Sequence, residues 1–298
     1  MMIKTSMMSV IILFFLLSIY LILPEKAETI NPISCPSLYN KHLYEYLNTI
    51  HYNMYNVKLS IPNVSKMTYD NFYMIYLLLL RKITKNEKNM LKSSTDKADK
   101  LIKLAGLKCL LNIPWKFYIS KNNLEMSMPY TIDNNIVIPE KQIGSISANT
   151  LIHEKIHILQ RNNQEKFNNY YKKLYPFLFS KIDNKIIPNE LEKRHMTNPD
   201  ANNTYWIYRI HNKLWLPLLI YEKQLQNCIE FAYPVLFVNN RVMIDVNNPS
   251  KLRSLLPNME KDVSLYHPNE IFACQLASTI VNNRPIDTDL YNMLNMLC

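Results

Sequence analysis

The sequence predicts an α+β fold, rich in helices and with a small sheet, and three observations lead to that prediction. Apolar residues recur at helical spacing in residues 96–111, alternate in residues 115–119, and form a β-rich stretch with a central turn in residues 130–139. Hydrophobic residues make up 48% of the chain and charged residues 19%, so the chain is expected to bury a core. No Gly/Ser-rich linker or repeat interrupts it, and residues 27–298 are predicted to form one domain.

The N-terminus carries an apolar segment. Residues 8–23, "MSVIILFFLLSIYLIL", are apolar apart from two serines and one tyrosine. With Met7 the run reaches the lower limit of about 17 residues for a membrane-spanning helix. The following "LPEKAET" is a poor signal-peptidase site, because Glu25 stands two residues before Ala27. We therefore predict that residues 1–26 are an uncleaved, transmembrane signal-anchor, with a cleaved signal peptide as the alternative.

The charges that flank this segment predict its orientation. Lys4 precedes the apolar run, which places the N-terminus in the cytoplasm and the main domain on the extracytoplasmic or lumenal side of a single-pass protein. Two glycosylation sequons, which begin at Asn63 and Asn202, would be used only in that orientation.

Composition excludes several classes of binding site. The chain has only two glycines, Gly106 and Gly144, so neither a GxGxxG loop nor a Walker A loop can be formed. The formal net charge is +10, but the lysines are scattered and no compact run of basic and aromatic residues occurs, so no nucleic-acid partner is expected. Five widely spaced cysteines without a CxxC exclude a cysteine-based zinc ribbon, and they leave open both reduced thiols and two disulfides with one free thiol.

The elements before the central motif follow from local signals. Residues 67–83 are predicted as a buried helix. Residues 93–95 supply caps for a helix over 96–111, which Pro114 ends. Residues 115–119 alternate and predict a strand.

The later elements include the motif itself. Residues 130–139 predict a hairpin or edge strand that turns at 133–135, and Ser147 is the expected N-cap of the next helix. The remaining half of the chain is predicted to be mostly helical with loops.

The segment "LIHEKIHILQ", residues 151–160, contains His-Glu-x-x-His. In a helix, His153 and His157 lie one turn apart on one face, so both imidazoles can bind one Zn²⁺ ion. Glu154 projects about 100° round the helix, beside the ion, where it suits a general base that takes a proton from zinc-bound water. The neighbouring apolar residues, which would hold such a helix in a core, are Leu151, Ile152, Ile156 and Leu159.

Chance is the alternative to a metal site. A chain of this composition contains one HExxH by accident in roughly one case in a hundred. Lys155 stands where such helices usually carry an uncharged residue, and we expect its side chain to extend to solvent.

A hydrolytic zinc site needs a third protein ligand and an open fourth position. In "YHPNEIFACQLAS", residues 266–278, Pro268 fits the first turn of a helix and Glu270 lies in that same turn. Glu270 is therefore the predicted third ligand, and a helix-dipole contact is the alternative role. Glu230 in "NCIEFAYP" is the second candidate; His195 and His211 are weaker, because neither has a partner at metal-ligand spacing.

At these residues the chain resembles the gluzincin type of zinc metallopeptidase, in which a glutamate on a later helix completes HExxH. Three pieces, "LIHEKIHILQR" (151–161), "NPD" (198–200) and "HPNEIFA" (267–273), resemble predicted metallopeptidases of large DNA viruses. The resemblance implies a zincin-like fold, Zn²⁺ held by His153, His157 and Glu270, and Glu154 as the base. The interval from His157 to Glu270 is far longer than in familiar gluzincins.

The resemblance also implies a substrate cleft. It suggests that the strand near residues 130–137 lies along this cleft, where its edge could pair with an extended peptide. It suggests that His267 or Tyr205 donates a hydrogen bond to the oxyanion, with helix capping or core packing as the alternative for both. Asp200 would support a zinc-bound histidine.

The predicted function is that of a zinc metallopeptidase, anchored in a viral or host membrane by its N-terminal helix, that hydrolyses a peptide or protein substrate. One alternative is a non-catalytic zincin-like protein used for binding or assembly, whose function Glu154→Gln would leave intact. Another is a zinc hydrolase of a non-peptide substrate, which a closed pocket in place of an open groove would favour.

Overall fold

The computed structural model describes residues 41–62, 64, 67–121, 123–182, 186–201, 204–238 and 241–297. The chain divides into residues 1–34 and 35–298, and every described residue belongs to the second part. The predicted signal-anchor, residues 1–26, and the asparagines of both sequons lie outside the described residues. Within the described ranges, none of the helices has the length and apolar character needed to span a membrane.

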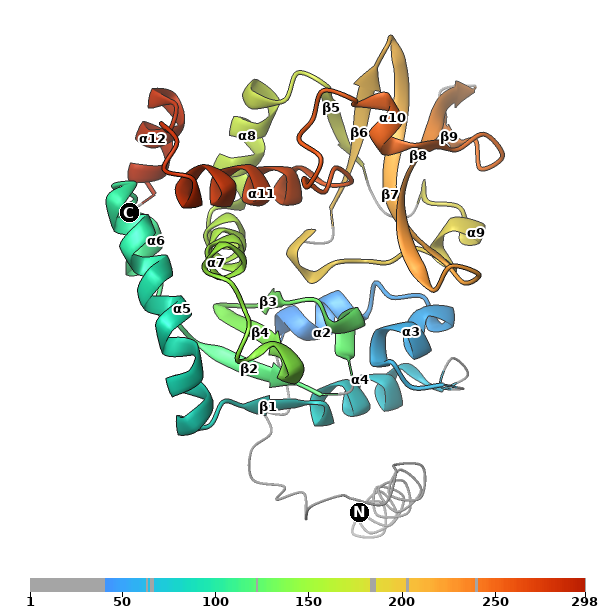
Figure 1. The fold of residues 1–298 in the computed structure, drawn as a ribbon. Helices are drawn as coiled ribbons and strands as arrows, with labels where there is room; N and C mark the ends of the chain where they lie inside the picture. The colour runs from blue at the N-terminus through green and yellow to red at the C-terminus, as the bar shows by residue number, and fades with distance from the viewer. Residues whose placement is uncertain are drawn as a thin grey trace, which may run out of the picture. The chain divides into compact units, whose positions relative to one another are not determined.

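The described chain is a mixture of helix and sheet, as the sequence predicts (Figure 1). A first sheet has the strand order β1-β2-β4-β3, with β2 and β4 parallel and the other pairs antiparallel. Its strands are β1 (Leu80–Lys82), β2 (Phe117–Ser120), β3 (Tyr130–Ile132) and β4 (Asn135–Pro139). The helices that precede it are α2 (Lys41–Leu47), η2 (Tyr52–Met54), α3 (Tyr55–Leu59) and α4 (Tyr69–Leu78). The predicted hairpin over 130–139 is confirmed as β3 and β4.

Two helix predictions need correction. The helix expected over 67–83 ends at Leu78, and the chain continues as β1. The helix expected over 96–111 is two helices, α5 (Lys85–Leu104) and α6 (Lys108–Asn112). Helix α5 starts early because Thr84 and Glu87 form a reciprocal capping box. Gly106 separates the two helices at a left-handed φ of +73°, which glycine adopts without strain.

The HExxH segment lies on α7 (Ala148–Asn162), followed by α8 (Gln164–Leu174). Ser147 caps α7 by accepting a hydrogen bond from the Thr150 N–H, as predicted. Short 3₁₀ turns stand before it, at η3 (Leu124–Ser127) and η4 (Glu140–Gln142).

The second half of the chain is dominated by a second sheet, so the prediction of a mostly helical half with one small sheet is wrong. This sheet is antiparallel with the order β10-β8-β7-β6-β5, and β9 also pairs with β8. Its strands are β5 (Leu178–Ile182), β6 (Tyr205–Ile210), β7 (Lys213–Glu222), β8 (Asn227–Val238), β9 (Arg241–Ile244) and β10 (Ser250–Lys251). Short helical pieces lie around it at α9 (Asn189–Glu192), η6 (Pro199–Ala201) and α10 (Leu252–Leu255).

Local signals for this sheet exist in the sequence. Strands β6 to β8 are rich in Tyr, Trp, Ile and Val, which favour strands over helices. His211 and Asn212 form the two-residue turn between β6 and β7, with φ of 50° and 59°. Positive φ at both central residues is typical of the tight hairpin turn whose twist matches that of the strands.

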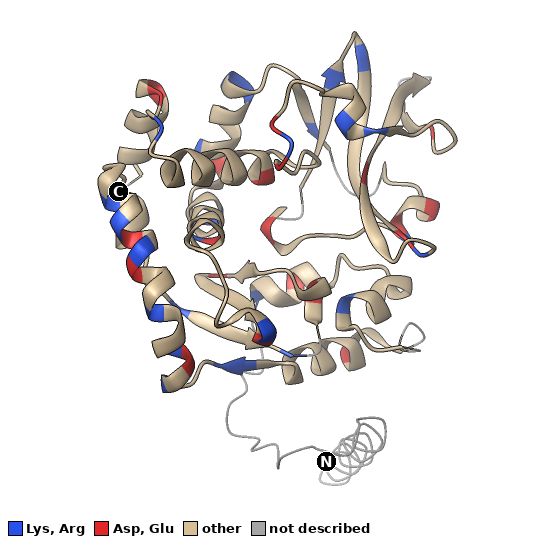
Figure 2. Ribbon diagram, in the orientation of Figure 1, with Lys and Arg blue, Asp and Glu red and all other residues tan. Residues whose placement is uncertain are grey.

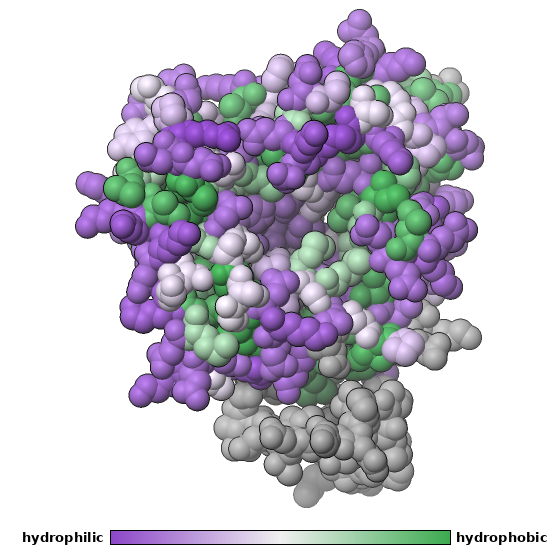
Figure 3. All heavy atoms as spheres, viewed as in Figure 1, coloured by the Kyte–Doolittle hydropathy of each residue, from purple (hydrophilic) through white to green (hydrophobic). Residues whose placement is uncertain are grey.

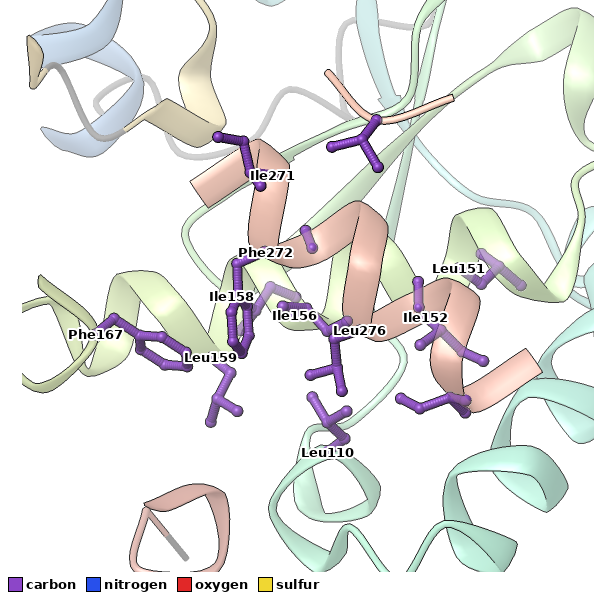
Figure 4. Close-up of a cluster of buried hydrophobic side chains, with 14 of the residues drawn as sticks. Leu110, Leu151, Ile152, Ile156, Ile158, Leu159, Phe167, Ile271, Phe272 and Leu276 are labelled. Atoms are coloured by element: carbon purple, nitrogen blue, oxygen red, sulfur yellow. The ribbon is translucent and has the colours of Figure 1, made fainter. Parts of the chain in front are cut away.

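The last helices are α11 (Pro268–Val281) and α12 (Thr288–Asn295). Helix α11 packs along α7, and Figure 4 shows Phe272 and Leu276 of α11 beside Ile156 of α7. All of these side chains are buried. Each contributes about 1.5–3 kcal/mol when removed from water, so this contact fixes the two helices against each other.

Candidate metal centre

Three side chains from α7 and α11 converge on one point. The Nε2 atoms of His153 and His157 lie 2.8 Å apart. Glu270, in the first turn of α11, has Oε2 3.5 Å from His153 Nε2 and Oε1 3.4 Å from His157 Nε2. Ligands about 2.0–2.2 Å from a tetrahedral zinc ion are about 3.3 Å from one another. The spacing of the three predicted ligands is therefore suited to a single ion.

The tautomer of His157 follows from its neighbours. The Gln160 amide nitrogen donates to the Asn269 carbonyl, 3.0 Å away, so the Gln160 Oε1 atom is the acceptor for His157 Nδ1 at 2.7 Å. His157 consequently carries its hydrogen on Nδ1 and directs the Nε2 lone pair at the centre. Burial lowers the pKa of His157 to about 3, so the ring is neutral, as a metal ligand must be.

Glu270 is held in place by Asn198, the first residue of the "NPD" piece. The Asn198 side-chain amide donates to Glu270 Oε1 at 2.9 Å and to the Tyr266 hydroxyl at 2.5 Å. Its Oδ1 accepts from the Asp200 N–H at 2.8 Å. This piece therefore orients one of the predicted ligands directly.

Asp200 lies closer to the centre than the sequence suggested. One of its carboxylate oxygens, a His157 nitrogen and a Glu270 oxygen all lie within 4.8 Å of one another. The same carboxylate accepts hydrogen bonds from the Thr131 N–H and hydroxyl and from Arg161 Nη2, the last at 3.2 Å. These donors engage the Asp200 carboxylate, and among the described residues neither histidine donates a hydrogen bond to it.

Glu154 has one carboxylate oxygen, Oε2, that is buried and without a hydrogen-bond partner in the described part of the chain. The side chain lines the same cavity as His153 and Glu270. Burial, reinforced by the charge of Asp200, raises the pKa of Glu154 well above its usual value. A carboxylate oxygen without a partner, in the cavity that His153 and Glu270 also line, is placed where a general base of a metal site would act. The donor set and this orphaned atom together fit a bound Zn²⁺.

Cys274 is a member of the site that sequence reasoning missed. A His153 nitrogen, a Glu270 oxygen and the Cys274 sulfur lie within 4.8 Å of one another. Burial disfavours the charged form of His153, but hydrogen bonds to Cys274 and Glu270 outweigh it and raise the pKa of this histidine. The signal was present in the sequence: Cys274 follows Glu270 by four residues, so both face the same side of α11.

The other candidate ligands lie elsewhere. Glu230 accepts hydrogen bonds from the Ser264 hydroxyl at 2.6 Å and the Leu265 N–H at 2.8 Å, and it is absent from the ligand groups of the described residues. His211 is exposed in the β6–β7 turn. His195 is buried, and its Nδ1 is 3.4 Å from the Tyr205 hydroxyl.

His267 is the N-cap of α11. Its Nδ1 accepts from the Asn269 N–H, and its Nε2 is 3.1 Å from the Thr204 hydroxyl. His267, His195 and Tyr205 line a separate cavity of about 20 Å³, room for about one water molecule. For His267 and Tyr205 the structure thus matches the capping and packing alternatives, and neither lines the large cavity beside Glu154.

Lys155 does not extend to solvent, contrary to expectation. Its side chain is buried, its Nζ lies 3.1 Å from Asp99 Oδ1, and it sits 3.8 Å above the centre of the Trp115 ring. A cation–π contact and an ion pair satisfy the charge locally, because α5 and the strand region before β2 cover this face of α7.

The edge of β3 is also not available to a peptide. The Thr131 N–H donates to Asp200, and the Thr131 carbonyl accepts from Arg161 Nη2 at 3.4 Å. The Asp133 N–H donates to His42 Nδ1 at 3.3 Å, and its carbonyl accepts from Arg161 Nη1 at 2.7 Å. The expectation that a substrate pairs with this strand is therefore wrong at Thr131 and Asp133, because side chains occupy the backbone groups that face away from β4.

A cavity of about 800 Å³ opens beside the centre. It is lined by α7 and α11, by the η3 turn and the segment leading to β3, and by the start of β8. A hollow with hydrophilic surface at its floor is seen near the middle of the face in Figure 3. This volume lies in the range of small-molecule and cofactor sites and would also take several residues of a peptide.

Comparison with known proteins identifies no relative. The chain matches no protein-family model, no curated protein and no solved structure.

Proposed function

We propose that the chain is a zinc metallopeptidase. The observation that carries this proposal is the convergence of His153 Nε2, His157 Nε2 and the Glu270 carboxylate within 2.8–3.5 Å. Glu154, whose Oε2 has no partner among the described residues, lines the same cavity as His153 and Glu270. A chance HExxH has no reason to meet a glutamate from a helix more than a hundred residues later in the chain.

The three ligands would hold Zn²⁺, and the hydrogen bonds from His157 to Gln160 and from Asn198 to Glu270 would keep two of them in place. When bound, zinc supplies Lewis acidity, which polarises a carbonyl group and makes water more acidic. Glu154 would accept a proton from the attacking water and pass it to the leaving amine. Burial raises the pKa of Glu154 above its usual value, so its carboxylate is a stronger proton acceptor than an exposed one.

A peptide substrate is supported by the size and the opening of the cavity. A volume of about 800 Å³ that reaches the surface along α7, α11 and β8 can take an extended chain. The apolar N-terminal run supports the further proposal that residues 1–26 tether this domain to a viral or host membrane, on the extracytoplasmic or lumenal side.

Metal content tests the proposal most directly. The full chain, purified in detergent, would be measured by mass spectrometry of bound metal, beside His153→Ala, Glu270→Ala and Glu154→Gln. We expect about one zinc per chain in the wild type and in Glu154→Gln, and loss of zinc from the two ligand variants. His211→Ala, at an exposed histidine in a turn, is the matched control and should keep its zinc.

Hydrolysis of a mixed peptide library tests the chemistry. The wild type should cleave peptides, and Glu154→Gln should lower the rate by about 10²–10⁴-fold while it retains zinc. Zinc binding without cleavage of any peptide, and with unchanged biological function in Glu154→Gln, would instead support a binding or assembly protein. Folded protein without zinc would refute the metal site.

A further inference from the structure

The large cavity is acidic although the chain as a whole is basic. The formal net charge of the sequence is +10, and in Figure 2 blue Lys and Arg segments are scattered over outer elements such as α5 and α8. The cavity lining nevertheless contains one lysine, Lys58, whose Nζ lies 2.5 Å from Glu125 Oε2, so its charge is already compensated. Beyond the acidic residues of the metal centre, Glu230, Glu260 and Asp262 line the same cavity.

These three carboxylates differ in the ion pairs and hydrogen bonds that they make. Glu260 lies 3.2 Å from Arg284 at the surface. Glu230 is partly buried and uses Oε1 to accept from Ser264 and Leu265, which ties the 260–265 segment to β8. Asp262 is exposed, and none of the ion pairs found among the described residues involves it. Glu230 and Asp262 are therefore the carboxylates left to meet a cation in the cavity.

The start of β8 supplies an open strand edge in the same place. The Pro234 carbonyl accepts from the Asp245 N–H at 2.9 Å, so at Pro234 the backbone faces away from β7. The N–H and C=O groups of successive residues point to opposite sides of a strand. The N–H and C=O groups of Cys228 and Glu230 therefore also face away from β7. Strand β10 covers this side only at residues 231–232, and β9 covers it at 235–238.

No described strand pairs with residues 227–230 of β8 on that side. Asn227, Cys228 and Glu230 line the cavity that also holds His153 and the buried, unpartnered oxygen of Glu154. Asn227 Oδ1 accepts from the Cys228 N–H at 2.8 Å, so on this edge the Cys228 carbonyl and the Glu230 backbone remain for a partner. This edge, the acidic residues and the buried carboxylate of Glu154 line one cavity.

We propose that residues 228–230 of β8 pair with the backbone of an extended peptide whose Lys or Arg side chain is bound by Glu230 and Asp262. This inference rests on the proposed peptidase function and defines its substrate class as basic peptides. An added strand supplies affinity through main-chain hydrogen bonds, and the side-chain pockets beside it supply selectivity. Two acidic groups that line one cavity favour a cation over a neutral or acidic side chain.

Binding to the inactive protein tests the inference without relying on turnover. The full-length, zinc-loaded Glu154→Gln chain in detergent is titrated against a fluorescent peptide of alternating Lys and Thr, with anisotropy as the readout. A peptide with Glu in place of Lys is the charge control. We expect the Lys peptide to bind at least about tenfold more tightly, with a difference that shrinks as salt is added.

Two variants test whether Asp262 and Glu230 cause the preference for the Lys peptide. Asp262→Asn should weaken the Lys peptide about threefold, and Asp262→Asn with Glu230→Gln about tenfold, because a glutamine can still accept from Ser264 and Leu265. Glu165→Gln, an exposed carboxylate on α8 outside the cavity lining, is the matched control and should leave binding unchanged. Equal binding of Lys and Glu peptides, or no effect of the double substitution, overturns the assignment of the cation subsite.

Backbone methylation tests the strand pairing. A Lys peptide N-methylated at alternate residues loses the donors that an added strand requires, and we expect about tenfold weaker binding from it. Two peptides are compared, one methylated at the odd residues and one at the even residues, and unchanged affinity of both overturns pairing with β8.

If the Lys peptide binds as expected but the wild type leaves it uncut, the proposed peptidase function fails while the binding site stands. If the wild type cuts acidic and basic peptides equally, the function stands and this inference fails.

Discussion

Two strand edges border the large cavity, β3 on one side and the start of β8 on the other. The outward backbone groups of β3 are bonded to side chains, whereas those at the start of β8 are mostly left without a neighbouring strand among the described residues. At β3, Arg161, Asp200 and His42 occupy the outward backbone groups of Thr131 and Asp133. At residues 227–230 of β8 no described strand covers the outward side, although Asn227 Oδ1 accepts locally from the Cys228 N–H at 2.8 Å.

The difference shows that a strand at the end of a sheet does not always have unpaired backbone N–H and C=O groups. Strand β3 stands last in its sheet, yet buried charged side chains satisfy it and link it to the "NPD" turn beside Glu270. The closed edge is thus tied to the candidate metal centre, whereas residues 227–230 of β8 carry the proposed peptide site. Four variants test this contrast between the two edges.

The largest effect is expected from Arg161→Met. Arg161 is largely buried and donates hydrogen bonds to the backbone carbonyls of Thr131 and Asp133 at the edge of β3. It also forms an ion pair with Asp200 at 3.2 Å. Its removal leaves the Asp200 carboxylate buried without its cation, and the free energy of unfolding in urea should fall by about 3–5 kcal/mol. Arg284→Met, which removes a surface partner of Glu260, should cost less than about 1 kcal/mol. Equal losses in the two variants would contradict the importance of this buried link.

The second effect is a pH dependence from His42. Burial, followed by the charge of Arg161, lowers the pKa of His42 from 6.5 to about 4 in the folded chain. The unfolded chain therefore binds a proton first as the pH falls, and stability present above pH 6.5 is lost between pH 6.5 and about 4. The loss should reach about 3 kcal/mol. In denaturation curves across this range, His42→Gln should lack this component, and an unchanged slope would refute it.

The third effect concerns a single hydroxyl at the closed edge. Thr131 Oγ1 donates to Asp200 and accepts from Arg161 Nη2 at 2.6 Å. Thr131→Val keeps the shape but removes both bonds to charged groups, and we expect about 2 kcal/mol lower stability in urea. Thr95→Val, at an exposed hydroxyl that bonds only the Lys92 carbonyl of its own helix, should change stability by less than about 0.5 kcal/mol.

The smallest effect is expected at the open edge. Asn227→Ala removes the side-chain acceptor of the Cys228 N–H, but Asn227 is exposed and water can replace the bond. We expect a change within about 0.5 kcal/mol in the same urea measurement. A loss as large as that of Thr131→Val would mean that β8 also depends on a side chain that closes its edge, and the contrast between the two edges would disappear.

Local rules recovered the parts of the site that lie within one helix. Ser147 as a cap, the single face shared by His153 and His157, and Glu270 in the first turn after Pro268 all follow from neighbours a few residues apart. The same rules could have placed Cys274 one turn from Glu270, and the turn at His211 and Asn212 could have indicated the β6–β7 hairpin.

The remaining features needed long-range contacts. Lys155 is buried because α5 brings Asp99 against it and Trp115 lies over it, and the preference of a lone lysine for solvent predicts the reverse. Likewise His267 is committed to Asn269 and Thr204, which the types of residue in "HPNE" do not disclose.

The sequence alone determined that this chain carries two histidines and a glutamate on one helix and a second glutamate at the start of another, because periodicity and capping are local. That these groups meet follows from the tertiary structure. It also decided that Asn198 and Asp200 stand beside them, that β3 is closed and that β8 is open. Burial and strand pairing depend on segments far apart in the chain, and no short pattern of residues encodes which of them will pack together.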